Sequence, residues 1–159
     1  MNPSGQVPAR VTVAAFVDVS DRADLERLLF FNPQQHRVRE RIIDAVRQHG
    51  RPAIIVKDGK MTVGVERRPH VQNLFFFHHQ GSRSRLCGVV LYLREPAEDI
   101  FILHMAVQPD YSMAGRWASL GLLFRMVDAV KAVGRKVKGV RYVRFMYAAK
   151  AAARVPVDS

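Results

Sequence analysis

The chain has 159 residues, of which 48% are apolar, and 25 Lys and Arg against 14 Asp and Glu give a formal net charge of +11. This length corresponds to one domain with a substantial core, and the apolar share argues against a disordered chain. No apolar run reaches the roughly 18 residues of a membrane-spanning helix, and the first residues lack the pattern of a signal peptide. We therefore expect a cytoplasmic protein that does not enter a membrane.

The single cysteine, Cys87, excludes an intramolecular disulfide and a multi-cysteine zinc site. It lies inside the apolar run Leu86–Leu93, which favours a buried thiol over a nucleophile. Neither His78 nor His79 has a spacing to other histidines that is typical of metal ligands, so we expect no metal site. The positive charge favours polyanionic partners, and a solvated basic surface is the alternative interpretation.

The N-terminal part of the chain alternates between strand and helix patterns. Residues 1–10 contain prolines and a glycine and are expected to be a flexible lead-in. The segment Val11–Val19 is rich in β-branched residues and predicts a strand, after which Ser20 is a suitable N-cap for a helix. The pair Asn32-Pro33 is typical of the start of a second helix, which Gly50 would end.

The middle of the chain is predicted to form most of a sheet. Asp58-Gly59 is a strong signal for a tight hairpin between two short apolar runs, Ala53–Lys57 and Met61–Glu66. Three further runs are dense in strand-forming residues: Leu74–Phe77, Leu86–Leu93 and Ile100–Val107. Their short separations indicate a mostly antiparallel sheet.

The C-terminal part is predicted to contain the longest helix, from Arg116 to Val133. Its expected buried stripe consists of apolar residues at helical spacing: Met113, Trp117, Leu120, Phe124 and Val127. A strand over Val137–Phe145 would follow, and the tail would fray near Val155-Pro156. The whole pattern predicts an α+β fold with a mixed, mostly antiparallel sheet, a single domain over residues 11–147 and a short tail over 148–159.

Two short sequence motifs resemble those of a known protein family. Ala106–Tyr111 reads Ala-Val-Gln-Pro-Asp-Tyr, and the pair Leu122-Leu123 falls in the predicted helix. With the order of elements over residues 11–147, these phrases resemble the GNAT superfamily of acyl-CoA-dependent N-acetyltransferases, although the sequence match is confined to roughly residues 88–133. The resemblance implies a GNAT-like sheet with helices on both faces, acetyl-CoA as co-substrate, and transfer of its acetyl group to a primary amine.

The resemblance also implies which residues would bind acetyl-CoA. Met105, Ala106 and Val107 would line the pantetheine arm, because a strand that splays from its neighbour leaves backbone groups to pair with it. The following loop would surround the pyrophosphate with Gly115, Arg116, Trp117, Ala118 and Ser119. A helix N-terminus presents N–H groups to an anion, and Arg116 would add a cation there.

Three side chains are candidates for the chemistry of transfer. Glu66 lies on a predicted strand of the kind on which the family often places a carboxylate base. His104, on the strand that would carry the acyl site, could act as a general base through water. Tyr147 follows the last predicted strand, where the family often places a general acid for the leaving thiolate. A solvated or packing role is the alternative for each residue.

Two other functions stay open beside the enzyme. The loop departs from the family pattern, because Trp117 stands where a small residue is usual, and this favours a catalytically inactive binding or regulatory module. The segment 125–154 holds nine bases against one acid, Asp128, which a nucleic-acid-binding domain would explain. The amine acceptor could be a small molecule or a protein, and a homodimer could supply the family's final hairpin, for which the residues after Gly134 are few.

Overall fold

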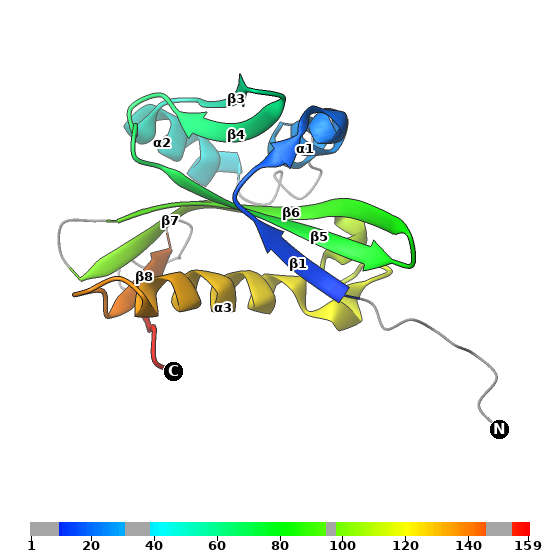
Figure 1. Ribbon diagram of the computed structural model, residues 1–159. Coiled ribbons are helices and arrows are strands. Elements are labelled where there is room, and N and C mark those ends of the chain that lie inside the picture. Colours follow the sequence, from blue (N-terminus) through cyan, green and yellow to red (C-terminus); the bar gives the residue numbers. More distant parts are fainter. Residues whose placement is uncertain (1–9, 31–38, 95–97, 146–153) are drawn as a thin grey trace.

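The computed structural model describes residues 10–30, 39–94, 98–145 and 154–159, which form an α+β fold (Figure 1). The main sheet has the order β1-β5-β6-β7-β8-β9, in which only the β7–β8 pair is parallel. Its strands are β1 (Arg10–Ala14), β5 (Gln72–Gln80), β6 (Arg83–Arg94), β7 (Asp99–Val107), β8 (Tyr142–Phe145) and β9 (Arg154–Pro156). A smaller sheet has the order β2-β4-β3, with β2 (Val17–Asp18), β3 (Pro52–Lys57) and β4 (Lys60–Val65).

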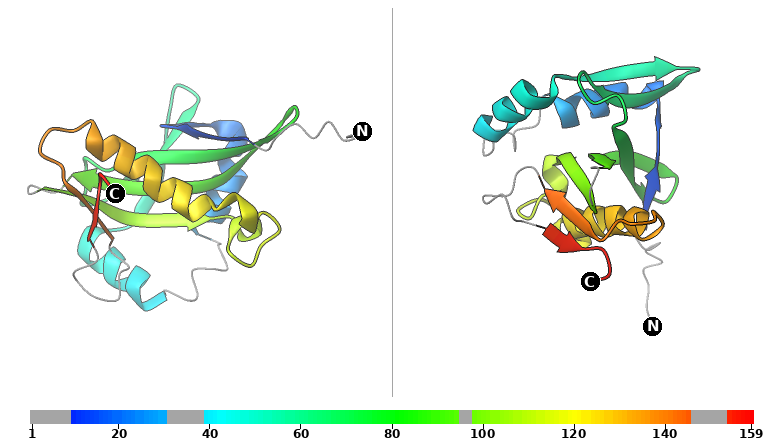
Figure 2. Two further views of the ribbon diagram at one scale, coloured as in Figure 1. Left: turned by 90° about the horizontal axis from the view of Figure 1, so that it is seen from below. Right: turned by 90° about the vertical axis from the view of Figure 1, so that its left-hand side faces the viewer.

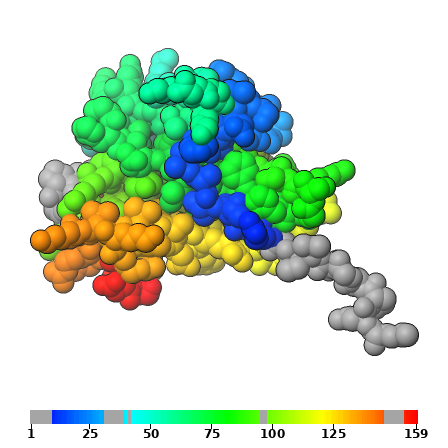
Figure 3. Space-filling model, viewed as in Figure 1, coloured from blue at the N-terminus to red at the C-terminus, as the bar shows by residue number. Residues whose placement is uncertain are grey.

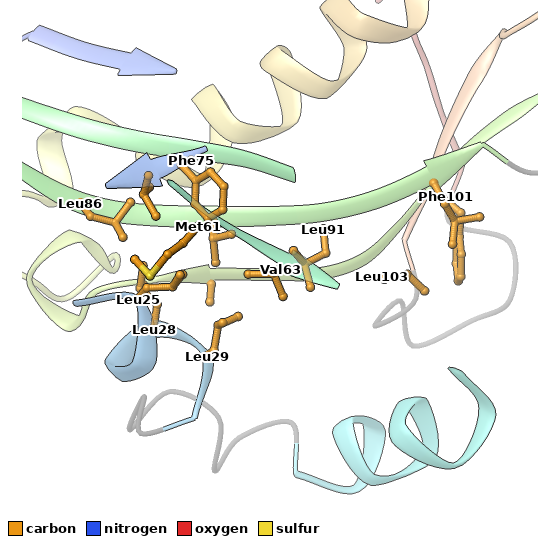
Figure 4. Close-up of a cluster of buried hydrophobic side chains, with 14 residues drawn as sticks. Leu25, Leu28, Leu29, Met61, Val63, Phe75, Leu86, Leu91, Phe101 and Leu103 are labelled. Atoms are coloured by element: carbon orange, nitrogen blue, oxygen red, sulfur yellow. The ribbon is translucent and has the colours of Figure 1, made fainter. Parts of the chain in front are cut away.

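Helices cover both faces of the main sheet. The α-helices of the described residues are α1 (Arg22–Leu29), α2 (Arg39–His49) and α3 (Leu122–Arg135). Figures 1 and 2 show α3 on one face, and α1, α2 and the smaller sheet on the other. Each face has its own core: Leu25 and Leu28 of α1 pack with Phe75 (Figure 4), whereas Met126 and Val130 of α3 pack on the opposite side. None of these helices combines the length and the apolar character that crossing a bilayer requires.

The first predicted strand is in fact two strands in two sheets. The chain bends at Ala15, so β1 pairs with β5 in the main sheet while β2 pairs with β4 in the smaller one. The bend lets Val17 turn into the core between the sheets, where it is buried. The helix after it is confirmed, but Ser20 is not its N-cap: a short 3-10 turn comes first, and Asp21 occupies the cap position without a side-chain hydrogen bond.

The hairpin at Asp58-Gly59 is confirmed, with both residues in the left-handed region at φ 53° and 74°. The expectation that it belongs to the main sheet is wrong, since β3 and β4 form the smaller sheet with β2. Gly50 ends α2 as predicted, with φ 89°. The predicted start of that helix at Asn32-Pro33 lies outside the described residues.

A buried amide joins the two sheets. Asn73 on β5 accepts a hydrogen bond from the backbone N–H of Val63 at 2.7 Å and donates to the carbonyl oxygen of Val63 at 2.8 Å. The side chain thus imitates a neighbouring strand for β4, at a place where both Asn73 and Val63 are buried. This link fixes the smaller sheet above β5.

The long helix starts later than predicted. It begins at Leu122 rather than Arg116, after a 3-10 turn over Ala118–Leu120 and a left-handed Gly121 at φ 56°. The predicted stripe is therefore wrong: Met113 and Phe124 are 84% and 73% exposed. The buried face consists instead of Leu122, Met126 and Val130.

The C-terminal residues belong to the sheet. β8 begins at Tyr142, five residues after the predicted start, and β9 pairs antiparallel with it where fraying was expected. Two bases of α3 hold the residues after β9: Lys131 Nζ donates to Ser159 Oγ at 2.7 Å, and Arg135 donates to the carbonyl oxygen of Val157 at 2.5 Å. Figure 3 shows this end of the chain packed beneath α3 and β8.

Candidate functional site

A β-bulge interrupts β7 near its middle. Leu91 of β6 faces His104, but the next residue, Tyr92, faces Ile102, so Leu103 is an extra residue on β7. Within the described residues, the parallel pairing of β7 with β8 runs as far as the pair of Ile102 and Phe145. Bulges re-aim side chains and often lie beside functional sites.

The bulge places two successive side chains on one face. Leu103 and His104 both line a cavity under α2, and Figure 4 shows Leu103 pointing towards that helix. The next residue, Met105, packs with the core on the α3 side. The second half of β7 therefore separates two spaces, one on each face of the sheet.

The first space, which we name the α2 cavity, has a volume of about 70 Å³. It lies between α2, the end of β4 and β7, and its walls are aliphatic except for two imidazoles, those of His49 and His104. Arg68 Nε donates to His49 Nδ1 at 2.7 Å. Because a guanidinium can only donate, His49 Nδ1 is the acceptor, and this ring is neutral.

His104 is also neutral near pH 7. Burial lowers the pKa of His104 to about 4, because the charged imidazolium loses its solvation against the apolar wall. So low a pKa makes His104 a poor general base for an ammonium ion. It suits a neutral hydrogen-bonding group in the wall of the cavity.

This pKa predicts a loss of stability in acid. The unfolded state, with a histidine pKa near 6.5, binds more protons than the folded state with its pKa of about 4, so the free energy of unfolding falls as pH drops from about 6.5 towards 4. Between about pH 7 and pH 5, His104 should contribute a loss of about 1–2 kcal/mol. Urea denaturation of wild type and His104→Gln at pH 7 and pH 5 measures this contribution to the free energy of unfolding. An equal pH dependence in the two proteins would contradict the prediction.

The second space, which we name the α3 hollow, has a volume of about 330 Å³. It lies between Met105 of β7, Ala118 and the first turn of α3, and the exposed side chains of Met113 and Phe124 form part of its lining. The first hydrogen bond of α3 runs from Arg125 N–H to the Gly121 carbonyl oxygen. Within the described residues, the N–H groups of Leu122–Phe124 have no such partner, as is usual in a first helical turn.

The loop before α3 uses its own donors internally. Gly115 N–H donates to the Ser112 carbonyl oxygen at 2.9 Å, and Trp117 N–H donates to that of Asp110 at 2.7 Å. Ala118 N–H donates back to the Gly115 carbonyl oxygen at 3.2 Å. These three groups do not present hydrogens to a ligand, although Ala118 lines the hollow.

The other predicted cofactor residues are dispersed. Ala106 and Val107 are buried and belong to the cores on opposite faces of the sheet. Arg116 is exposed, with its guanidinium 5.1 Å from the centre of the Trp117 ring, and Ser119 is exposed. Only Met105 and Ala118 of the predicted set line the α3 hollow.

Sequence reasoning missed the group that anchors this loop. His78 of β5 is buried, and its Nδ1 lies 2.7 Å from the hydroxyl oxygen of Tyr111. The His78 ring packs edge-on to Trp117 with centroids 4.8 Å apart. Arg85 adds an ion pair with Asp110 at 3.0 Å. Trp117 thus anchors the loop to β5. The sequence signal that could have indicated a buried His78 is its position two residues after Phe76 in the same strand.

Two of the predicted catalytic residues lie towards the α2 cavity. His104 lines it, whereas Glu66 is exposed beside it, directly after the lining residue Val65. A Glu66 carboxylate oxygen accepts a hydrogen bond from Arg51 N–H at 3.1 Å. Tyr147 lies outside the described residues.

Several bases of the segment 125–154 are engaged within the fold. Arg154 and Arg144 pair with the buried Asp99 at 2.5 and 3.4 Å, while Lys131 and Arg135 hold the C-terminal residues. These contacts hold four of the bases in place within the fold, although Arg135 and Arg154 remain exposed. The buried thiol is confirmed elsewhere: Cys87 donates to the Phe76 carbonyl oxygen at 3.2 Å, and burial raises its pKa to about 12.

No protein-family model, curated protein or solved structure matches the chain. In the part of the chain that the structure describes, no group of three histidine, cysteine or acidic residues is arranged to hold a metal ion.

Proposed function

We propose that this protein is a GNAT-type N-acetyltransferase that binds acetyl-CoA in the α3 hollow and its amine acceptor from the α2 cavity. The observation that carries the proposal is the β7 bulge, which turns His104 towards one space and Met105 towards the other. A thioester lying along β7 at this point would be open to an amine from the α2 side.

The strand connections support the same assignment. Strands β1, β5, β6 and β7 form an antiparallel run, and α3 then leads to β8, which lies parallel to β7. The described residues of β8 pair with β7 as far as Ile102, and we propose that the two strands splay beyond this point, as the sequence resemblance implies. The hairpin of β3 and β4 lies between α2 and β5 in the chain, and it forms the smaller sheet together with β2.

The residues around the α3 hollow fit a long, anionic cosubstrate. Its apolar lining from Met105, Met113 and Phe124 suits a pantetheine arm. The N–H groups of Leu122–Phe124 and the positive end of the α3 dipole suit a pyrophosphate. The proposed anion site is therefore the first turn of α3. It is not the loop at Gly115 and Trp117, because those N–H groups donate to carbonyl oxygens within the loop.

The protein would position the two substrates and supply a proton acceptor. Acetyl-CoA supplies an activated acyl group. The acceptor amine would form a C–N bond to the acyl carbon as the C–S bond breaks, and the proton lost from nitrogen would end on the thiol. Leu103 lies outside the β6 ladder, so its backbone N–H is the group we assign to the thioester oxygen. Glu66 is assigned as the base on its position, because its exposed carboxylate lies beside the α2 cavity, from which the amine would approach.

Filling the α3 hollow should abolish binding of the cosubstrate. Ala118→Phe places a ring in the hollow, and we expect the acetyl-CoA affinity to fall at least about tenfold, equivalent to about 1.4 kcal/mol. Isothermal titration calorimetry at moderate salt measures the effect. The matched control is Ser119→Phe, one residue on and exposed outside the hollow, which should bind like wild type. Equal affinities in the two variants, or no binding by wild type, would contradict the proposal.

A binding module without transfer activity is the second candidate. The internal hydrogen bonds of Gly115, Trp117 and Ala118 favour it, since the loop presents few donors to a phosphate. Acetyl-CoA binding without acetylation of any amine in a broad panel would support this candidate over the enzyme.

A further inference from the structure

The α2 cavity is small and mostly apolar. Leu29, Ile42, Val46 and Leu103 supply aliphatic walls around its volume of about 70 Å³. A single water molecule needs roughly 10–15 Å³ of such a cavity, so it holds about five non-hydrogen atoms. This size matches one short aliphatic side chain, and the apolar walls do not suit a sugar ring or a polyamine.

The polar groups of the wall are uncharged. Arg68 Nε holds the acceptor Nδ1 of His49, and burial keeps His104 neutral. Neither ring supplies a full charge to balance a cation or an anion inside the cavity. The charged parts of an occupant must therefore lie outside, at the edge of the cavity.

That edge is rich in arginine. The segments after α2 and after β4 are joined by two backbone hydrogen bonds, from Glu66 N–H to the Arg51 carbonyl oxygen at 3.1 Å and from Arg67 N–H to that of His49 at 2.9 Å. Three cations follow from these segments, namely Arg51, Arg67 and Arg68, which we name the arginine rim. Glu66 is the carboxylate that these segments place among them.

Arg68 is the best placed of the three. Its Nε contacts the wall residue His49, and in the described residues no hydrogen bond occupies its two terminal nitrogens. A guanidinium fork with these nitrogens available is matched to a carboxylate. Arg67, by contrast, donates to the Arg47 carbonyl oxygen at 2.9 Å.

We infer that the acceptor is a small hydrophobic α-amino acid of about the size of leucine or methionine. Its side chain fills the α2 cavity, its carboxylate pairs with Arg68, and its amino group lies between Glu66 and the β7 bulge. The inference rests on the proposed function of the same site and adds the chemical class of the acceptor.

Direct binding tests the inference separately from transfer. Nuclear magnetic resonance titration with leucine, in the presence of free CoA, should give an affinity at least about tenfold higher than leucinamide, which lacks the carboxylate. Aspartate and putrescine should not bind. Arg68→Gln should remove the preference for leucine over leucinamide, and Arg68→Lys should restore part of it.

Filling the cavity supplies a second test that preserves the rim. Ala45→Leu extends a cavity-lining side chain and should weaken leucine binding at least about tenfold. Gln48→Leu, on the exposed face of the same helix, is the control and should leave it unchanged. Equal binding of leucine and leucinamide, or no effect of Ala45→Leu, overturns the inference. Acetyl-CoA binding without leucine binding would refute the acceptor class alone, whereas loss of both would also refute the proposed function.

Discussion

Gly115→Ala should destabilise the protein by about 2–4 kcal/mol and weaken acetyl-CoA binding with it. A Cβ atom at this position would lie 2.4 Å from the carbonyl carbon and oxygen of Asp110 and 2.5 Å from the carbonyl oxygen of Pro109. These are backbone atoms, so the loop must move to relieve the contact. Since Ala118 and the start of α3 follow this loop, its displacement should reshape the α3 hollow.

Urea denaturation and calorimetry measure the two effects of Gly115→Ala. The control is Gly81→Ala, where a Cβ would meet no atom within 4 Å and the only cost is the left-handed backbone at φ 58°. That control should lose about 1 kcal/mol and bind acetyl-CoA normally. Wild-type stability in Gly115→Ala would show that the close packing of the loop against Asp110 is not needed.

Asn73→Ala should cost about 2–4 kcal/mol of unfolding free energy. The substitution removes two hydrogen bonds, of 2.7 and 2.8 Å, and leaves the buried N–H and carbonyl groups of Val63 without partners. It should loosen the smaller sheet from β5. Since β4 ends beside the α2 cavity, leucine binding should weaken as well.

The neighbouring residue gives the control for Asn73→Ala. Gln72 is exposed, and within the described residues its side chain makes only a long bond of 3.4 Å to the His70 carbonyl oxygen. Gln72→Ala should therefore change stability by no more than about 0.5 kcal/mol. Similar losses in the two variants would mean that the amide does not join the sheets.

Local patterns predicted much of the fold because local chemistry determines those elements. Asp58-Gly59 specifies a tight turn, and Gly50 ends α2, whatever lies around them. The division of the strand at Ala15 between two sheets was not predictable, because β-branched residues favour both strands equally. Whether the residues after Ala15 join the main or the smaller sheet depends on tertiary packing, in which Val17 enters the core.

The candidate site was predicted less well for a related reason. The apolar spacing of Met113, Trp117 and Phe124 fits a helix, yet Trp117 instead packs on His78 from a distant strand. The helix begins only after the left-handed Gly121. The bulge at Leu103 depends on pairing with β6, and no local sequence signal marks it.

Chemical-shift mapping of free CoA on the labelled protein tests whether the α3 hollow binds the cosubstrate. We predict that the amide signals of Met105 and of Leu122–Phe124 shift with one-to-one saturation, because these residues border the α3 hollow. The signals of the exposed residues Lys136 and Lys138 should move little. Shifts confined to the basic residues after α3, or none at all, would contradict the account of this hollow as an acyl-CoA site.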